Sequence, residues 1–206
     1  MIAGFLAALA RLVAGSSVRW LHPPTEDGQR VFIANHTSHL DFIVLWSHLP
    51  PRIRKQTRPV AARDYWSRDP IRRFLAERVF VALLIDRMPA SGEEAAAAGK
   101  RAVAQMLDAL SSGASLILFP EGTRGKGDAL GTFRSGIFHL CREKPGLEVV
   151  PVWIENLNRV LPKGEFLPVP MLSRISFGVP FRLEEGETKD AFLTRARKKI
   201  EELNAA

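Results

Sequence analysis

Short apolar runs alternate along this chain with longer segments of helical periodicity. The apolar runs predict strands at residues 31–34, 58–62, 79–85, 115–119, 148–154 and 174–178. The periodic segments predict helices at residues 38–49, 66–77, 91–111, 135–143 and 188–203. Alternation of this kind favours an α/β fold with a mostly parallel central sheet flanked by helices.

The first 22 residues follow a different pattern. Their large apolar residues lie on one stripe of a helix, at Ile2, Phe5, Leu6, Leu9, Leu12 and Val13. Arg11 interrupts the run, which is shorter than the roughly 20 apolar residues of a spanning helix. The stripe predicts a short amphipathic helix that lies on a membrane surface or packs on its own domain. We divide the chain into this N-terminal segment, residues 1–22, and a single domain, residues 23–206.

The composition is that of a folded, basic protein. Hydrophobic residues make up 46% of the chain and charged residues 25%, so disorder is a poor interpretation for most of it. The net charge of +7 predicts an anionic partner: a phospholipid surface, a phosphorylated small molecule or nucleic acid. The single cysteine, Cys141, excludes an intrachain disulfide and favours a reducing compartment. Its apolar neighbours predict a position in the core.

A polar cluster follows the first predicted strand. The chain reads Asn-His-Thr-Ser-His-Leu-Asp over residues 35–41, where the carboxyl end of a parallel strand commonly carries a site. Thr37 or Ser38 can cap the helix that follows. Asp41 then lies in the first helical turn, with its carboxylate turned back toward His36. A carboxylate on one imidazole nitrogen fixes the tautomer and makes the other nitrogen a better general base.

This pair has no nucleophile of its own. The sequence contains no Gly-x-Ser-x-Gly elbow, and nothing places Cys141 near His36. Such a pair suits a reaction in which the substrate supplies a hydroxyl, whose proton the base removes as the oxygen attacks an acyl carbon. A His and an Asp at this spacing also occur as capping or surface residues. His39 competes for the role of base, but it precedes Asp41 by only two residues and is expected to face elsewhere.

A second cluster follows the strand predicted at residues 115–119. Pro120 ends that strand, and Glu121 and Arg124 then place a hydrogen-bond acceptor and a planar cation in one glycine-containing loop. The loop is not a nucleotide-binding phosphate loop, because Pro120 stands where that motif needs glycine and Gly127 where it needs Ser or Thr. A flexible basic turn is the simpler alternative.

Together, the two clusters resemble the glycerolipid acyltransferase family, typified by bacterial 1-acyl-glycerol-3-phosphate acyltransferase. The resemblance rests on Asn-His-x-Ser-x-x-Asp at 35–41 and Phe-Pro-Glu-Gly-Thr-Arg at 119–124. Weaker blocks follow the family's order: Leu-Ile-Asp-Arg at 84–87, Phe-Arg-Ser-Gly at 133–136 and Val-Pro-Val at 150–152. Either main motif alone is moderately specific for the family, whereas the two motifs in this order and at this spacing are strong evidence of the resemblance.

The resemblance implies a role for each matching residue. His36 is expected to be the general base and Asp41 its orienting partner. The expected substrate-binding residues are Arg87, Glu121, Gly122, Thr123, Arg124 and Arg134, with Arg87 and Arg124 on the acceptor's phosphate. The chain departs from the pattern at Val81, where the family has glycine, and at Arg134, where lysine is commoner.

The resemblance also implies a reaction and a location. We expect residues 23–206 to form an acyltransferase domain that moves a fatty acyl group from acyl-coenzyme A or acyl carrier protein to the free hydroxyl of a lysophosphatidic acid-like acceptor. No acyl-enzyme, metal or other cofactor is expected, and the protein would act at the cytoplasmic face of the cell membrane, as a peripheral or monotopic protein. Another lyso-lipid, such as an amino-acid lipid or a glycolipid, is an alternative acceptor.

The segment between residues 52 and 78 is rich in basic residues. It contains Arg52, Arg54, Lys55, Arg58, Arg63, Arg68, Arg72, Arg73 and Arg78, interleaved with Tyr65, Trp66 and Phe74. Basic residues with interfacial aromatics suit an anionic lipid surface. A non-enzymatic module that binds membrane or nucleic acid is the second alternative, but no nucleic-acid-binding motif is present and such a module has no use for the His–Asp pair.

Overall fold

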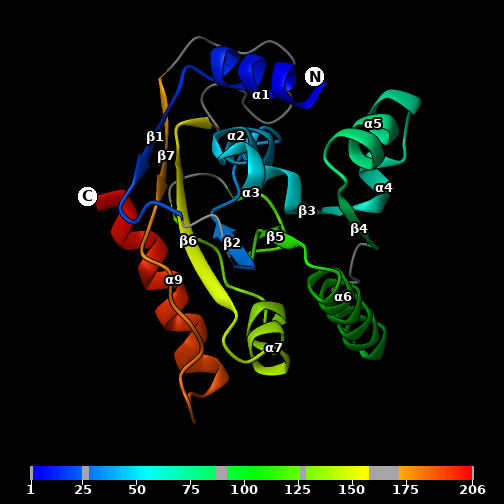
Figure 1. The fold of residues 1–206 in the computed structure, drawn as a ribbon. Helices are drawn as coiled ribbons and strands as arrows, with labels where there is room; N and C mark the ends of the chain where they lie inside the picture. The colour runs from blue at the N-terminus through cyan, green and yellow to red at the C-terminus, as the bar shows by residue number, and fades with distance from the viewer. Residues whose placement is uncertain (1, 25–27, 87–91, 126–128, 158–171, 206) are drawn as a thin grey trace.

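The protein is built around a twisted central sheet (Figure 1). The computed structural model describes residues 2–24, 28–86, 92–125, 129–157 and 172–205. Within them the sheet has seven strands: β1 (Ser16–Trp20), β2 (Arg30–Ala34), β3 (Thr57–Ala62), β4 (Leu83–Ile85), β5 (Ser115–Leu118), β6 (Glu148–Glu155) and β7 (Ser173–Phe177). Their order is β1-β7-β6-β2-β5-β3-β4, and β6 and β7 are the antiparallel neighbours among otherwise parallel pairs. The predicted α/β class with a mostly parallel sheet is confirmed.

Helices cover both faces of this sheet. They are α1 (Ile2–Val13), α2 (Asp41–His48), α3 (Pro51–Gln56), α4 (Arg63–Trp66), α5 (Pro70–Phe74), the π-helix η1 (Leu75–Val79), α6 (Glu93–Ser111), α7 (Gly136–Glu143) and α9 (Lys189–Ala205). Alternate residues of the central strand β2 serve the two faces. Val31 and Ile33 pack with α6, α7 and α9, while Phe32 and Ala34 pack with α1 and α2. All four side chains are fully buried, as expected for a central parallel strand.

The segment between β3 and β4 differs from its prediction. The helix predicted at residues 66–77 is broken, because Pro70 starts a new helix and the Asp69 carboxylate caps it by accepting from the Arg72 amide at 2.9 Å. The strand predicted from Val79 begins only at Leu83, since Val79 is the last residue of η1 and residues 80–82 form neither helix nor strand. A short apolar run does not by itself distinguish a helix from a strand, and this run contains the end of one and the whole of the other.

Two elements were not predicted at all. Strand β1, within the segment we set apart as residues 1–22, pairs in parallel with β7 from Ser16↔Ser173 to Trp20↔Phe177. The short helix α3 begins at Pro51, which fits the preference of proline for a first helical position.

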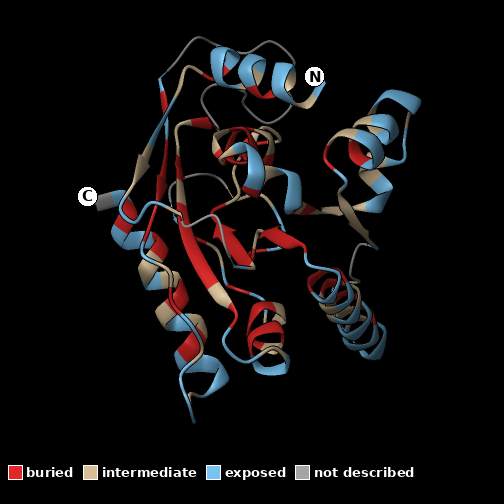
Figure 2. Cartoon of the chain, in the orientation of Figure 1, coloured by how far each residue is buried: buried red, intermediate tan, exposed pale blue. Residues whose placement is uncertain are grey.

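Helix α1 packs on α2 through its small residues. Ala7 is fully buried, and Ala3 packs against the same core. The large apolar side chains point outward, and Phe5 and Leu12 are 68% and 78% exposed. Figure 2 shows this outer face of α1 as exposed along most of its length. In the described part of the chain, none of the helices combines the length and the apolar character needed to cross a membrane.

Candidate active site

The two polar loops leave neighbouring strands at the same edge of the sheet. Strands β2 and β5 are parallel, with Ile33 opposite Leu118, so the loops that follow them start side by side. The amide of Gly125 donates to the carbonyl of His36 at 2.8 Å, which ties the second loop to the first. The fold thus brings together two motifs that are about 80 residues apart in the sequence.

His36 and Asp41 form the pair that the spacing predicts. The Nδ1 atom of His36 lies 2.8 Å from Oδ2 of Asp41, and the aspartate side chain is completely buried. Asp41 is the first residue of α2, so its carboxylate points back over the preceding loop. There Oδ2 also accepts from the amides of Thr37 at 2.6 Å and Ser38 at 2.8 Å. These bonds fix the carboxylate before any substrate arrives.

The prediction that Thr37 or Ser38 caps this helix with its side chain is wrong, because the bonds run from the loop to the helix. The residue before α2 is Leu40, and no side chain caps the helix from there. Instead of Thr37 or Ser38 bonding the helix, the helical Asp41 accepts from their amides. This arrangement serves the site better, because a residue inside a helix holds its side chain more precisely than a loop residue does.

The imidazole of His36 is oriented on a second side by Phe119. The two rings are stacked with their centroids 4.2 Å apart, at an interplanar angle of 21°. When the protonated Nδ1 donates to this carboxylate, the lone pair of the neutral ring is on Nε2. The side chain of His36 is 23% exposed. A substrate hydroxyl can therefore reach an imidazole that is otherwise held in place.

The Glu121 carboxylate holds two backbone segments of the site together. Its side chain is buried, and Oε1 accepts from the backbone amide of His36 at 2.9 Å. Its other oxygen, Oε2, accepts from the amide of Gly131 at 2.8 Å. The resemblance implies that Glu121 contacts the acceptor, but in this geometry the carboxylate joins three parts of the protein and holds the backbone of His36.

The remaining predicted binding residues surround the same edge. Gly122 and Thr123 are exposed, and Arg124 is half-buried. Gly122 has a φ of +69°, and a Cβ there would lie 2.8 Å from Cδ of Arg134, so glycine lets the exposed Arg134 lie across this turn. The amide of Arg134 donates to the carbonyl of Pro120 at 2.8 Å. Arg87 lies outside the described residues.

The charge of Arg124 acts on a neighbouring histidine. Burial, and after it the positive charge of Arg124, lowers the pKa of His39, so this side chain is neutral near pH 7. The His39 ring is stacked on Tyr65 with centroids 4.7 Å apart, while His36 holds the carboxylate of Asp41. His39 thus packs on Tyr65, while Asp41 is paired with His36, and the positive charge of Arg124 lies close to this loop.

Two residues with clear structural roles here were not singled out from the sequence. The side chain of Asn35 accepts from the amide of Ile154 at 2.7 Å and donates to its carbonyl at 2.8 Å. It therefore extends the β2–β6 pairing into the site loop. Gly131 is the second: a Cβ there would lie 2.9 Å from Oε2 of Glu121. Asn35 lies in the first motif, but the contact of Gly131 depends on folding and has no local signal.

The single cysteine is far from nucleophilic. Cys141 is buried in α7, and burial raises the pKa of its thiol to about 12. The prediction of a core position is confirmed. Among the described residues, no three His, Cys, Asp or Glu side chains are grouped so that they could hold a metal ion.

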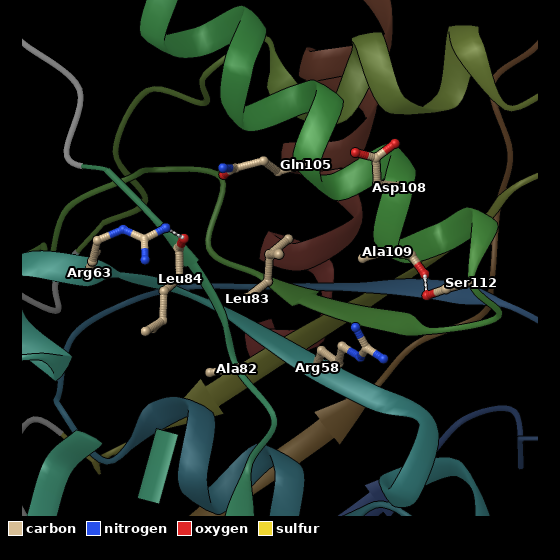
Figure 3. A pocket seen from close by; sticks show the side chains of 9 residues that line it. All are labelled: Arg58, Arg63, Ala82, Leu83, Leu84, Gln105, Asp108, Ala109 and Ser112. Carbon is tan, nitrogen blue, oxygen red and sulfur yellow. Dashed lines mark hydrogen bonds between the residues drawn. The ribbon is translucent and has the colours of Figure 1, made fainter. Parts of the chain in front are cut away.

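An open groove lies elsewhere, between α6, β3 and the edge strand β4. Figure 3 shows its lining, which includes Arg58, Arg63, Gln105 and Asp108 around a volume of about 480 Å³. Arg63 is occupied there, donating to the Leu84 carbonyl at 2.7 Å and to Asp86 at 2.9 Å. The groove contains no histidine, so its size does not make it the reaction centre.

Sequence comparison identifies the family. A sequence model described as Acyltransferase matches residues 17–155, about two thirds of the chain. The chain belongs to the Acyltransferase family.

The chain is also similar to named relatives. It is 28% identical over 141 residues to the chloroplastic 1-acyl-sn-glycerol-3-phosphate acyltransferase LPAT1 of Arabidopsis thaliana, covering 68% of this chain and 36% of that protein. It is 29% identical over 144 residues to a 1-acyl-sn-glycerol-3-phosphate acyltransferase of Chlamydomonas reinhardtii, covering 69% of this chain and 39% of the relative. The chain therefore spans less than half the length of these curated relatives.

The fold has a counterpart among solved structures. The crystal structure of the 1-acyl-sn-glycerophosphate (LPA) acyltransferase PlsC from Thermotoga maritima superposes with a TM-score of 0.74 at 18% sequence identity. The likeness covers 100% of this chain and 79% of that one. At this identity it establishes the shared fold, in agreement with the predicted acyltransferase-like architecture.

Proposed function

We propose that this protein transfers a fatty acyl group from a thioester donor to the free hydroxyl of a lysophosphatidic acid-like acceptor. The observation that carries the proposal is the His36–Asp41 pair. A partly exposed imidazole is held by a fully buried carboxylate at 2.8 Å, in a loop tied to the second family motif. The acceptor class is taken from the names of the relatives, which are 1-acyl-sn-glycerol-3-phosphate acyltransferases.

In the proposed reaction His36 is the general base. Its Nε2 removes the proton of the acceptor hydroxyl as the oxygen attacks the thioester carbon. The carbon–sulfur bond then breaks, and the imidazolium returns the proton to the departing thiolate, so that an ester and a thiol are formed. Asp41 stabilises the imidazolium that exists between the two proton transfers. A positioned base of this kind contributes about 10² to 10⁴ in rate.

A direct transfer fits the residues at the site. The buried thiol of Cys141, with its pKa raised to about 12, is not available to form an acyl-enzyme. Arg124 is suited to the acceptor's phosphate, because a guanidinium can bond two phosphate oxygens at once. Its position near His39 and His36 would aim the hydroxyl of a bound acceptor at the base. Acyl-coenzyme A and acyl carrier protein are both suitable donors, and no further cofactor is proposed.

We also propose that the protein works at a membrane surface, as its lipid substrates require. The exposed apolar side chains of α1, among them Phe5 and Leu12, would lie among the lipid headgroups and upper acyl chains. Because α1 packs on α2, which begins at Asp41, this attachment would place the catalytic loop close to the bilayer. The cytoplasmic leaflet is the proposed surface, given the single free cysteine and the basic charge.

The experiment that tests this function measures thiol release by the purified protein. The reaction contains vesicles, an acyl thioester and a lyso-lipid, with acyl-coenzyme A and acyl carrier protein compared as donors. The proposal predicts thiol release that requires the acceptor, with lysophosphatidic acid preferred over lyso-lipids without a phosphomonoester. Release without any acceptor would identify a thioesterase, and preference for an amino-acid lipid or glycolipid acceptor would replace the proposed substrate.

A further inference from the structure

Helix α5 exposes two large apolar side chains to solvent, and neither is needed to fill the core. Ile71 is 73% exposed and Phe74 is 49% exposed. They are three positions apart, and Arg78 follows four positions later, so the three lie on one face of the continuous α5–η1 helix. The helix meets the core through its fully buried Ala76 and through Leu75 and Val79, which are partly buried. The outward face is therefore left for a partner.

Arginines surround this apolar face. Arg68, Arg73 and Arg78 line a shallow groove of about 380 Å³ beside Phe74, together with Asp69 and Glu77. Arg73 forms an exposed pair with Glu77 at 3.1 Å. Within the described chain no ion pair engages Arg68 or Arg78. We call Ile71, Phe74, Arg68, Arg73 and Arg78 the α5 face.

This combination fits the headgroup region of a bilayer. Apolar side chains reach the upper acyl chains while arginines contact phosphates, as amphipathic membrane-surface segments do. A partner without net negative charge would leave Arg68 and Arg78 without counter-charges, which an anionic lipid supplies. Tyr65 lies under Arg72 with the guanidinium 4.5 Å from the ring centroid, which adds an interfacial aromatic next to this face.

The α5 face and the outer face of α1 lie at the same end of the molecule. Figure 1 shows both helices at the upper end of the view and α7 at the opposite end, and Figure 2 shows the outer surfaces of α1 and α5 as exposed. Helix α1 and the short helix α4, which precedes α5, both contact the start of α2. Helix α1 packs on α2, and Phe42, the residue after Asp41, contacts Trp66 of α4 edge-on at 5.3 Å.

We infer that the α5 face is a second docking surface for an anionic phospholipid bilayer, separate from α1. This inference rests on the proposed membrane function. A single helix on a membrane leaves the protein free to rotate about the axis of that helix. A second contact removes that freedom and fixes the catalytic loop relative to the lipid surface. Ile71 and Phe74 insert, and Arg68, Arg73 and Arg78 bind the phosphates of acidic headgroups.

The test measures binding of the full chain to vesicles by flotation, using neutral phosphatidylcholine vesicles and vesicles that also contain phosphatidylglycerol. One variant combines Ile71→Ser with Phe74→Ser, and a second combines Arg68→Gln with Arg78→Gln. Matched controls are Val179→Ser, an exposed apolar residue after β7, and Arg142→Gln on α7. Circular dichroism verifies that each variant is folded.

We expect the apolar double variant to bind both kinds of vesicle at least about tenfold more weakly. The arginine double variant should lose roughly 30-fold on anionic vesicles at low salt and little on neutral ones, at about fivefold for each charge. The controls should bind like the unchanged protein. Unchanged binding of both α5 variants, with the protein still held through α1, would overturn the inference.

Activity in detergent separates this result from the proposed function. Lysophosphatidic acid dispersed as mixed micelles removes the need for docking on a vesicle, so the α5 variants should transfer acyl groups there at the rate of the unchanged protein. Weak vesicle binding with normal micellar activity supports the second docking surface. A protein that binds vesicles through the α5 face but transfers no acyl group in either assay would contradict the proposed function and leave the docking surface intact.

Discussion

The buried carboxylate of Glu121 gives a prediction that distinguishes a scaffold role from substrate binding. In Glu121→Gln the side chain keeps its size, but one of its two acceptor atoms becomes an NH₂ group. The amide of His36 or of Gly131 then faces a second donor, at a site where the hydrogen bonds are now 2.9 and 2.8 Å long. Leaving one buried polar group unsatisfied costs about 1 to 3 kcal/mol of unfolding free energy. For a chain of this size we expect Tm to fall by roughly 3 to 10 °C.

The same substitution should lower kcat more than it changes the acceptor KM. One of the two amides that Glu121 holds belongs to His36, so its release would allow the backbone of the proposed base to shift. A displacement of about 1 Å in a catalytic group can cost on the order of 100-fold in rate. The assay is steady-state thiol release at varied lysophosphatidic acid, alongside thermal unfolding by circular dichroism.

The control is Glu201→Gln on α9, whose carboxylate forms an exposed pair with Arg197. Its unfolding free energy should change by less than about 0.5 kcal/mol, because exposed ion pairs contribute little. If Glu121→Gln keeps the Tm of the unchanged protein and raises the acceptor KM strongly with kcat preserved, the scaffold role is refuted. Glu121 would then contact the acceptor directly, as the family resemblance implies.

Three further substitutions test other parts of the account. Arg124→Ala should raise the acceptor KM at least about tenfold, since charged hydrogen bonds contribute about 1.5 to 3 kcal/mol each, and an unchanged KM would exclude contact with the phosphate. Val81 has a φ of +47°, which is costly for a β-branched residue, so Val81→Gly should raise unfolding free energy by about 1 kcal/mol in thermal unfolding; a lower Tm would contradict that strain. Burial and then Arg11 lower the pKa of His48 to about 4, so the unfolded chain binds this proton more readily. Stability should therefore fall between pH 6.5 and about 4, and His48→Gln should reduce this slope in urea unfolding; an equal slope would exclude His48 as its source.

The sheet was largely predictable from the sequence because its central strands are short and continuously apolar. Residues 31–34 lie between Arg30 and Asn35, and residues 116–119 between Ser115 and Pro120, and apolar runs so short and so bounded favour strands. Strand β1 could not be found in this way. It lies at the edge of the sheet, includes Ser16, Ser17 and Arg19, and depends on pairing with β7, more than 150 residues away.

The His36–Asp41 pair was predictable for a local reason, whereas the scaffold around it was not. His36 and Asp41 are joined by one loop and one helical turn, so their spacing alone brings the side chains together. The bonds from Glu121 to His36 and Gly131 require the packing of two strands and a loop, which no short pattern encodes. The left-handed conformation at Val81 was equally hidden, although the resemblance places glycine there, and glycine adopts a positive φ without a steric cost.

The central claim is that His36 acts as the general base of acyl transfer, and the most direct test compares His36→Ala with the unchanged protein. Acceptor-dependent thiol release is measured at saturating donor and lysophosphatidic acid, with the exposed His22→Ala as the matched control. The account predicts that His36→Ala lowers kcat by about 10² to 10⁴ while its thermal unfolding stays cooperative, and that His22→Ala retains full activity. A folded His36→Ala protein that releases thiol at close to the unchanged rate would contradict the account.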